Sequence, residues 1–286
     1  MIEFDKLVKS GVQFGHQTWR WNPKMDPYIW GEKNGIHLID VSKTAYQLER
    51  AAQFLESLSV EGKTVLWCGT KKAAQQAMAR VAKETRSPLV SHRWIGGTLT
   101  NYLQVKKSVT KLLHLEDVVT RSGKMHYTKK ELSVFQKQIE RLKKNIGGLR
   151  KLIWPVGAIV VVDVKKEHVA LSEARETGVP IIALVDTNCD PSGITYVIPA
   201  NDDAPRSIEC VLGYLTEAVA RGQKTAATKG QKAPQVEVAP VDISPSVEQV
   251  LELALGDAEA AEGAKEEKAK PRIAVRKLSK KVDVKR

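Results

Sequence analysis

Two apolar, β-branched segments constrain the fold most. GAIVVVDV at 157–164 and VPIIALVD at 179–186 contain almost no polar residues, as is typical of strands whose sheet is covered on both faces. The helix-like segment KEHVALSEARETG lies between them. A strand, a helix and a second strand in this order favour parallel pairing. The two segments therefore predict a parallel sheet with helices on both sides.

Shorter segments repeat this alternation along the chain. The patterns at 36–40, 89–92 and 195–199 predict strands, and the run at 206–221 predicts a closing helix that ends at Gly222. The fold class is therefore α/β: a doubly wound parallel sheet of the flavodoxin or Rossmann type. We expect this α/β domain to comprise residues 1–100 and 154–223.

The stretch VLWCGTKKAAQQAMAR at 65–80 has the layout of a strand, a turn at Gly69 and a helix that begins near Lys71. Such a turn offers backbone N–H groups and positive charge to a phosphate. The phosphate belongs either to a nucleotide cofactor or to a nucleic acid. The sequence contains no GxxxxGK[ST], GxGxxG, GxSxG or HExxH motif. We therefore predict a protein that is not an enzyme, with a nucleotide-binding enzyme that uses the Gly69 turn as the alternative.

Residues 101–153 differ from the rest of the chain. A capping box formed by Thr128 and Glu131 opens a helical run, and apolar residues recur there at spacings of three and four, as in a coiled coil. They are Leu132, Phe135, Ile139, Leu142, Ile146 and Leu149. The preceding run has a similar apolar series, which Glu116 interrupts, and the polar turn RSGKMHY separates the two. The pattern predicts an inserted antiparallel helical hairpin.

Charge is distributed unevenly within a formal net charge of +12. The segment 101–153 has 13 Lys and Arg residues against 4 Asp and Glu, whereas 154–223 has 5 against 10. A basic end and an acidic end favour an oriented contact with a polyanion. An ordinary solvated charged face remains the alternative.

Residues 224–286 change composition and are expected to be largely disordered, with a possible short helix at 245–255. The last 16 residues read equally well as a polybasic arm or as a soluble tail. Cys68, Cys189 and Cys210 are isolated, which favours reduced thiols over a zinc ribbon or disulfides. No apolar run approaches the length of a membrane span, and we expect a cytoplasmic location.

One group of residues suggests a divalent-cation site. His16, Asp186, Asp202 and Asp203 belong to segments that we expect to converge, since two of these segments follow predicted strands. Their nitrogen and oxygen atoms suit zinc or magnesium. Apart from this possible structural cation, the sequence predicts no cofactor.

Two segments combine aromatic and basic residues in a way that suits RNA. GHQTWRWNPKMDPYIWGEKNG at 15–35 is expected to be a long loop, and HRWIGGTLTNY at 92–102 repeats its character around a glycine pair. Aromatic rings and arginine planes stack on unpaired bases, while hydroxyl and amide groups bind phosphates and 2′-hydroxyls. The alternative is that the tryptophans fill space in the core, which we favour for Trp94.

Taken together, the motifs in residues 2 to about 222 resemble the bacterial ribosomal protein S2 family of the small subunit. The motifs that carry the resemblance are GHQTWRWNPKMDPYIWGEKNGIHLID, GTKKAAQQA, RWIGGTLTN, TKKELSVF, NIGG, VDTNCDPSG and YVIPANDDAPRSI. The resemblance implies a structural protein bound to small-subunit ribosomal RNA between head and body. It also implies a role in docking ribosomal protein S1, and through it in capturing messenger RNA at initiation.

The expected phosphates are then those of ribosomal RNA, and the expected location is the bacterial ribosome. The expected partners are this RNA, other small-subunit proteins including S1 and, indirectly, messenger RNA. A protein-docking scaffold whose RNA contact is incidental remains a rival. The residues predicted to bind RNA are Arg20, Lys24, Lys71, Lys72, Arg93, Thr98, Asn101, Lys106 and Lys107.

Overall fold

A computed structural model describes residues 2–121 and 127–228. The central sheet has five parallel strands in the order β5-β4-β6-β7-β8. Their bounds are β4 Thr64–Cys68, β5 Leu89–Val90, β6 Val156–Val162, β7 Ile181–Val185 and β8 Tyr196–Pro199. Counted along the chain, this is the order 2-1-3-4-5 of a doubly wound sheet. The predicted parallel sheet is confirmed.

Helices cover both faces of this sheet. One face packs against α1 (Phe4–Ser10), α2 (Val41–Val60), α3 (Lys72–Thr85) and α7 (Pro205–Thr228), and the other against α6 (His168–Glu176). Because successive strand residues point to opposite faces, Val160 and Ile182 belong to the first core, whereas Val161 and Ala183 belong to the second. Burial on both faces explains why the strands are almost entirely apolar.

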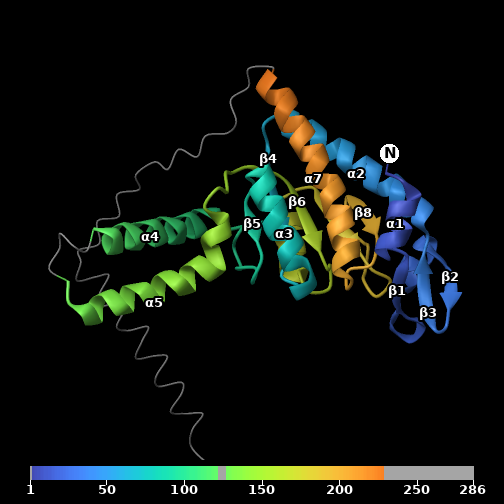
Figure 1. Cartoon of the computed structure of the whole chain (residues 1–286), viewed down its shortest axis with the longest axis horizontal. Helices are drawn as coiled ribbons and strands as arrows, with labels where there is room; N and C mark the ends of the chain where they lie inside the picture. Colours follow the sequence, from blue (N-terminus) through green and yellow to red (C-terminus); the bar gives the residue numbers. More distant parts are fainter. Residues whose placement is uncertain (1, 122–126, 229–286) are drawn as a thin grey trace, which may run out of the picture.

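Two helices, α4 (Tyr102–Thr120) and α5 (Lys129–Ile146), extend from one side of the sheet, and η4 (Gly147–Leu149) leads back toward β6 (Figure 1). Leu115 and Phe135 are buried between them, and Val105 and Leu112 join the core nearer the sheet. Glu116 lies beside this apolar series, where its carboxylate is 2.6 Å from the Arg150 guanidinium. Most of the polar turn lies outside the described residues, and a coiled-coil geometry stays a prediction.

The N-terminal region forms a second, antiparallel sheet with the order β1-β3-β2. Its strands are β1 (Phe14–Gln17), β2 (Ile29–Lys33) and β3 (Ile36–Ile39), with the 3₁₀ turns η1 (Thr18–Arg20) and η2 (Pro23–Tyr28) between the first two. The prediction of one long loop at 15–35 was therefore wrong. The strand predicted at 36–40 exists but pairs here rather than in the parallel sheet.

The last helix is longer than predicted. Gly222 lies inside α7, buried against α2, and the helix continues to Thr228. Residues 224–228 are thus helical, while the possible helix at 245–255 and the polybasic end lie outside the described residues. Within residues 2–121 and 127–228, every helix is too short or too polar to cross a bilayer.

Candidate functional site

The turn after β4 accepts a carboxylate from the chain itself. Glu167, which is 3% exposed, lies just before α6. Its Oε1 accepts hydrogen bonds from the backbone N–H of Thr70 (3.1 Å) and from the Thr70 hydroxyl, while the Cys68 thiol lies 3.5 Å from Oε2. Glu167 therefore occupies the place at the strand–turn–helix where the sequence predicted an external phosphate.

The next residue, Lys71, points into an acidic cluster at the carboxyl ends of the strands. Its Nζ lies 2.7 Å from Asp202, 2.6 Å from Asp203 and 3.6 Å from Asp163. Burial lowers the pKa of Lys71, but the hydrogen bonds to Asp202 and Asp203 raise this pKa by more than burial lowers it. The ammonium therefore stays charged. Burial, together with the charges of Asp186 and Asp163, raises the pKa of Asp202 to about 7 despite the nearby ammonium.

His16 joins the small sheet to this cluster. Its Nδ1 lies 3.1 Å from Asp186 and its Nε2 lies 3.2 Å from Asp203. The hydrogen bond with Asp186 raises the pKa of His16, while burial opposes that rise. The strand approaches so closely that a Cβ on Gly15 would lie 2.6 Å from the Thr187 side chain, which requires glycine at this position.

The structure brings the four predicted metal ligands together. The ligand atoms of His16, Asp186, Asp202 and Asp203 lie within 4.8 Å of one another. A mixed nitrogen and oxygen donor set of this kind suits zinc or magnesium. The Lys71 ammonium, however, already supplies positive charge at Asp202 and Asp203. A cation would have to displace this lysine or share its carboxylates.

A second buried glutamate shapes the loop at 92–101. Glu173, on α6, accepts hydrogen bonds from Trp94 Nε1 (3.0 Å) and from the backbone N–H groups of Gly97 (2.8 Å) and Leu99 (2.9 Å). Trp94 is buried, as its core interpretation predicts. The same arrangement leaves Arg93 and Asn101 exposed.

Thr98 is the exception among the predicted RNA contacts of this loop. Its side chain is 0% exposed, and its hydroxyl donates to the carbonyl oxygen of Ile95 at 2.6 Å. The hydroxyl is not available to an outside phosphate, so Thr98 leaves the candidate set. Lys71 is committed to the aspartates described above, whereas Lys72 at the start of α3 is exposed.

Two further predicted residues belong to the N-terminal region. Arg20 is exposed and lies over the Trp19 ring, with the guanidinium carbon 4.6 Å from the ring centre. Lys24 binds Asp190 at 2.7 Å and the Ser192 hydroxyl at 2.9 Å, which lowers the pKa of Asp190 to about 2. Both side chains are thus exposed, but Lys24 is already paired with Asp190.

The two extended helices carry the densest positive charge. Lys107 on α4 is exposed and Lys106 is half-buried, while Lys143 and Lys144 are exposed near the end of α5. Among the described residues, none of these four lysines forms an ion pair within 4.0 Å. Their charge is available to a polyanion.

Several aromatic side chains of the N-terminal region are exposed. Trp19 is 72% exposed and Trp30 is 76% exposed, with Phe14 half exposed. Exposed aromatics in one region are unusual on an isolated domain and mark an interaction surface. The sequence predicted one long loop at 15–35 around Trp19 and Trp30, whereas Trp19 lies on the turn η1 and Trp30 on the strand β2.

Sequence reasoning also missed Glu167 and Glu173. One signal was present: Glu173 falls among Ala170, Leu171 and Ala174, on the apolar face of its helix. A carboxylate at such a position needs buried hydrogen-bond donors. Nothing in the sequence identifies those donors. They lie 73 to 79 residues from Glu173 and 97 to 99 residues from Glu167 along the chain.

The similarity to known proteins covers nearly the same part of the chain as the structure describes. A family model described as "Ribosomal protein S2" matches residues 7–222. Among curated proteins, the small ribosomal subunit protein uS2 of Micrococcus luteus is 42% identical over 242 residues, which cover 84% of this chain and 84% of that protein.

Proposed function

Because the chain belongs to the ribosomal protein S2 family, we propose that it binds small-subunit ribosomal RNA through the basic surface of α4 and α5. It is a ribosomal protein of the small subunit and a structural constituent of the ribosome. The observation that carries the RNA proposal is the set of unpaired lysines on the two helices, Lys106, Lys107, Lys143 and Lys144. Arg20, Lys72, Arg93 and Asn101 are further exposed contacts.

Neutralising Lys106, Lys107, Lys143 and Lys144 to glutamine tests this surface. Each phosphate contact adds about 0.7 to 0.9 to the slope of log K against log salt concentration. We therefore expect the variant to bind ribosomal RNA more weakly. We also expect the magnitude of this slope to fall by up to about 3. Co-sedimentation with small subunits across a salt titration measures both effects.

A matched control removes the same charge from other exposed lysines. Lys6, Lys9, Lys33 and Lys83 are exposed and lie outside α4 and α5. We expect their substitution by glutamine to change the salt slope much less. Equal slopes for the two quadruple variants would show that only net charge matters and would contradict the proposed surface.

The finer proposal places the protein between the head and body of the subunit, where it docks ribosomal protein S1 and so helps capture messenger RNA. Trp19 on η1 and Trp30 on β2 are both exposed, which supports a protein contact. The acidic balance of 154–223 also suits a protein better than RNA. A pull-down with S1 after nuclease treatment tests it. Loss of S1 on nuclease treatment would favour tethering by RNA and contradict direct docking.

A second proposal concerns a structural cation held by His16, Asp186, Asp202 and Asp203. Their convergence within 4.8 Å favours it. We expect zinc or magnesium to bind the full chain at about one ion per chain and to raise its melting temperature by mass action. Elemental analysis after dialysis checks the stoichiometry, and Asp202→Asn should lower it. Protein that retains no ion and gains no stability would contradict the site.

The alternative of a nucleotide-binding enzyme at the Gly69 turn has no such support. The Thr70 N–H already binds Glu167, and the Lys71 ammonium already binds aspartates. Both groups that would receive a phosphate are therefore committed within the chain.

A further inference from the structure

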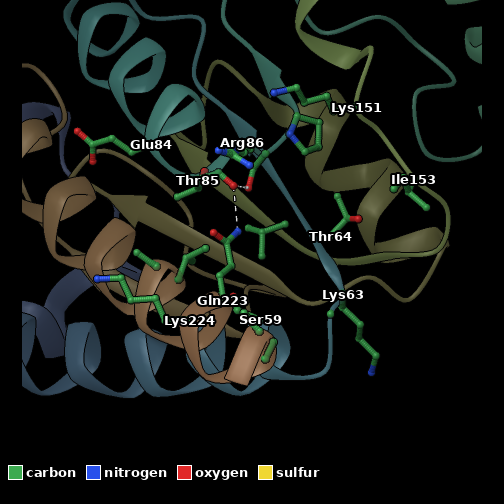
Figure 2. Close-up of a pocket in the computed structure, with 18 residues that line it drawn as sticks. Ser59, Lys63, Thr64, Glu84, Thr85, Arg86, Lys151, Ile153, Gln223 and Lys224 are labelled. Carbon is green, nitrogen blue, oxygen red and sulfur yellow. Dashed lines mark hydrogen bonds between the residues drawn. The ribbon is translucent and has the colours of Figure 1, made fainter. Parts of the chain in front are cut away.

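A cavity of about 560 Å³ opens at the amino ends of β4 and β6 (Figure 2). His16 and Lys71 do not line it. It is bounded by the end of α3, the last turns of α7 and the segment before β6. Val65, Ile153 and Val219 provide apolar wall, and Gln223 and Thr85 provide polar groups. This volume lies in the range of small-ligand sites.

Positive charge surrounds the cavity. Four lining residues are basic, namely Lys63, Arg86, Lys151 and Lys224, and the one acidic lining residue is Glu84. Lys63 is paired with Glu61 at 2.8 Å. Over residues 2–121 and 127–228, no carboxylate lies within ion-pair distance of Arg86, Lys151 or Lys224. Three cations at this cavity are therefore without an internal counter-charge.

The ends of α2 and α3 do not account for these cations. Basic side chains often offset the exposed carbonyl groups at a helix C-terminus. Here the carbonyl of Thr85, at the end of α3, accepts from Gln223 Nε2 at 2.9 Å and from Ser87 Oγ at 3.4 Å. At the end of α2, the N–H of Gly62 donates to Ser59 at 3.2 Å. Backbone and neutral groups already serve these ends.

Arg86 adds a backbone observation. It adopts the left-handed conformation, with φ 54° and ψ 23°, directly after α3. Glycine is the usual residue in this position, because a Cβ makes the conformation unfavourable. Strained residues of this kind gather at ligand sites. The Arg86 side chain lines the cavity, as Figure 2 shows.

We propose that this cavity binds a nucleotide, with the phosphate held by Arg86 and Lys151 and the nucleoside against the apolar wall. Arginine and lysine form charge-assisted hydrogen bonds with phosphate oxygens. The nucleotide is either free or an unpaired nucleotide of RNA, since both present the same groups. The site is separate from α4 and α5 and goes beyond the proposed function.

Equilibrium dialysis of the full chain at low salt tests the site, with 5′-AMP, adenosine and inorganic phosphate as probes. We expect 5′-AMP to bind at one site per chain and at least tenfold more tightly than adenosine or phosphate alone. Arg86→Gly should weaken this binding at least tenfold while the melting temperature stays the same or rises, because glycine suits the left-handed conformation. Lys151→Ala should weaken it as well.

Lys83→Ala is the matched control, since Lys83 is an exposed cation in the last turn of α3 that does not line the cavity. Wild-type protein that does not bind 5′-AMP would overturn the proposal, as would unchanged binding in Arg86→Gly and Lys151→Ala.

A second experiment distinguishes a free nucleotide from an unpaired nucleotide of RNA. It uses a hairpin RNA with one bulged nucleotide and a fully paired hairpin as competitors. Competition with 5′-AMP by the bulged RNA alone indicates RNA, and binding of 5′-AMP without competition indicates a free nucleotide. The salt slope of the α4 and α5 lysine variant tests the ribosomal RNA proposal independently.

Discussion

Glu173 lies under the loop at 92–101 and holds it from inside. Its two carboxylate oxygens together accept from Trp94, Gly97 and Leu99, so one side chain satisfies donors that would otherwise be buried without partners. This bonding turns Arg93 and Asn101 outward, where they are available to RNA. The exposed residues of this loop thus depend on a glutamate that is itself buried.

Removing this acceptor should destabilise the protein strongly. We expect Glu173→Ala to lower the free energy of unfolding by about 3 kcal/mol, because each buried donor left unpaired costs about 1 kcal/mol or more. Glu173→Gln keeps one carbonyl oxygen and should cost less. Urea unfolding measures both. Glu176→Ala, an exposed glutamate on the same helix, is the control and should change stability by less than about 0.5 kcal/mol. Equal effects at the two positions would contradict this role.

At the residue scale, the sequence predicts which groups can act but not which partners they have. The lysine and threonine after Gly69 are visible as donors in the sequence. Thr70 donates to Glu167, 97 residues away along the chain, and Lys71 donates to Asp202, 131 residues away. A donor and an acceptor so far apart in the sequence come together only when the chain folds. The local sequence pattern around each residue therefore does not predict the hydrogen bond. Thr98 failed as a predicted contact for a different reason: it is buried, and its hydroxyl bonds to the carbonyl oxygen of Ile95 only three residues away.

Among the elements, the buried strands were the most predictable. β6 and β7 are nearly pure apolar runs because both faces of the sheet are covered. The buried apolar residues of α5 were equally predictable, since they recur at helical spacing. The small sheet was not predicted, because β1 pairs with β3 across a long polar stretch with a register irregularity. Its strands are short and partly exposed, so they lack clear alternation.

The end of α7 shows how packing overrides a local signal. Glycine commonly ends a helix, but Gly222 continues α7 because the helix passes α2 at very short distance. A Cβ at this position would lie 2.5 Å from the carbonyl oxygen of Glu56 and 2.6 Å from the Ser59 side chain. Gly222 is therefore a packing residue, not a stop.

Substituting alanine at the two glycines of α7 separates packing from helix propensity. Gly222→Ala should lower the free energy of unfolding by about 2 kcal/mol, since the overpacking cost exceeds the gain in helix propensity of about 1 kcal/mol. At Gly213, a Cβ would meet no atom within 4 Å, so Gly213→Ala should raise stability by up to about 1 kcal/mol. Thermal unfolding compares the two. A stabilised Gly222→Ala variant would contradict the packing role.

Across the whole molecule, one polar network joins the two sheets. His16 on β1 binds Asp186 after β7 and Asp203 after β8, while Lys71 binds Asp202. The folded state raises the pKa of Asp202 to about 7 and also raises the pKa of His16 above its usual 6.5. Both groups bind protons more tightly in the folded state than in the unfolded state.

This proton uptake predicts the direction of the pH dependence in metal-free protein. Since the folded state holds more protons, these two groups make stability fall as pH rises, through Asp202 between about pH 4 and 7 and through His16 above about 6.5. The slope for one titrating group is at most about 1.4 kcal/mol per pH unit. Asp202→Asn should flatten the fall below pH 7 in urea unfolding with EDTA present. An unchanged pH profile in this variant would contradict the assignment.

The carboxylate that fills the turn after β4 has a consequence for how this molecule responds to its surroundings. Doubly wound sheets commonly bind a ligand at this turn. The ligand then stabilises the turn only to the extent that its concentration allows. Here the group that binds the turn is Glu167, a residue of the same chain, so one carboxylate is always present for each turn. The conformation of this turn therefore follows from folding alone and does not vary with the concentration of any bound compound.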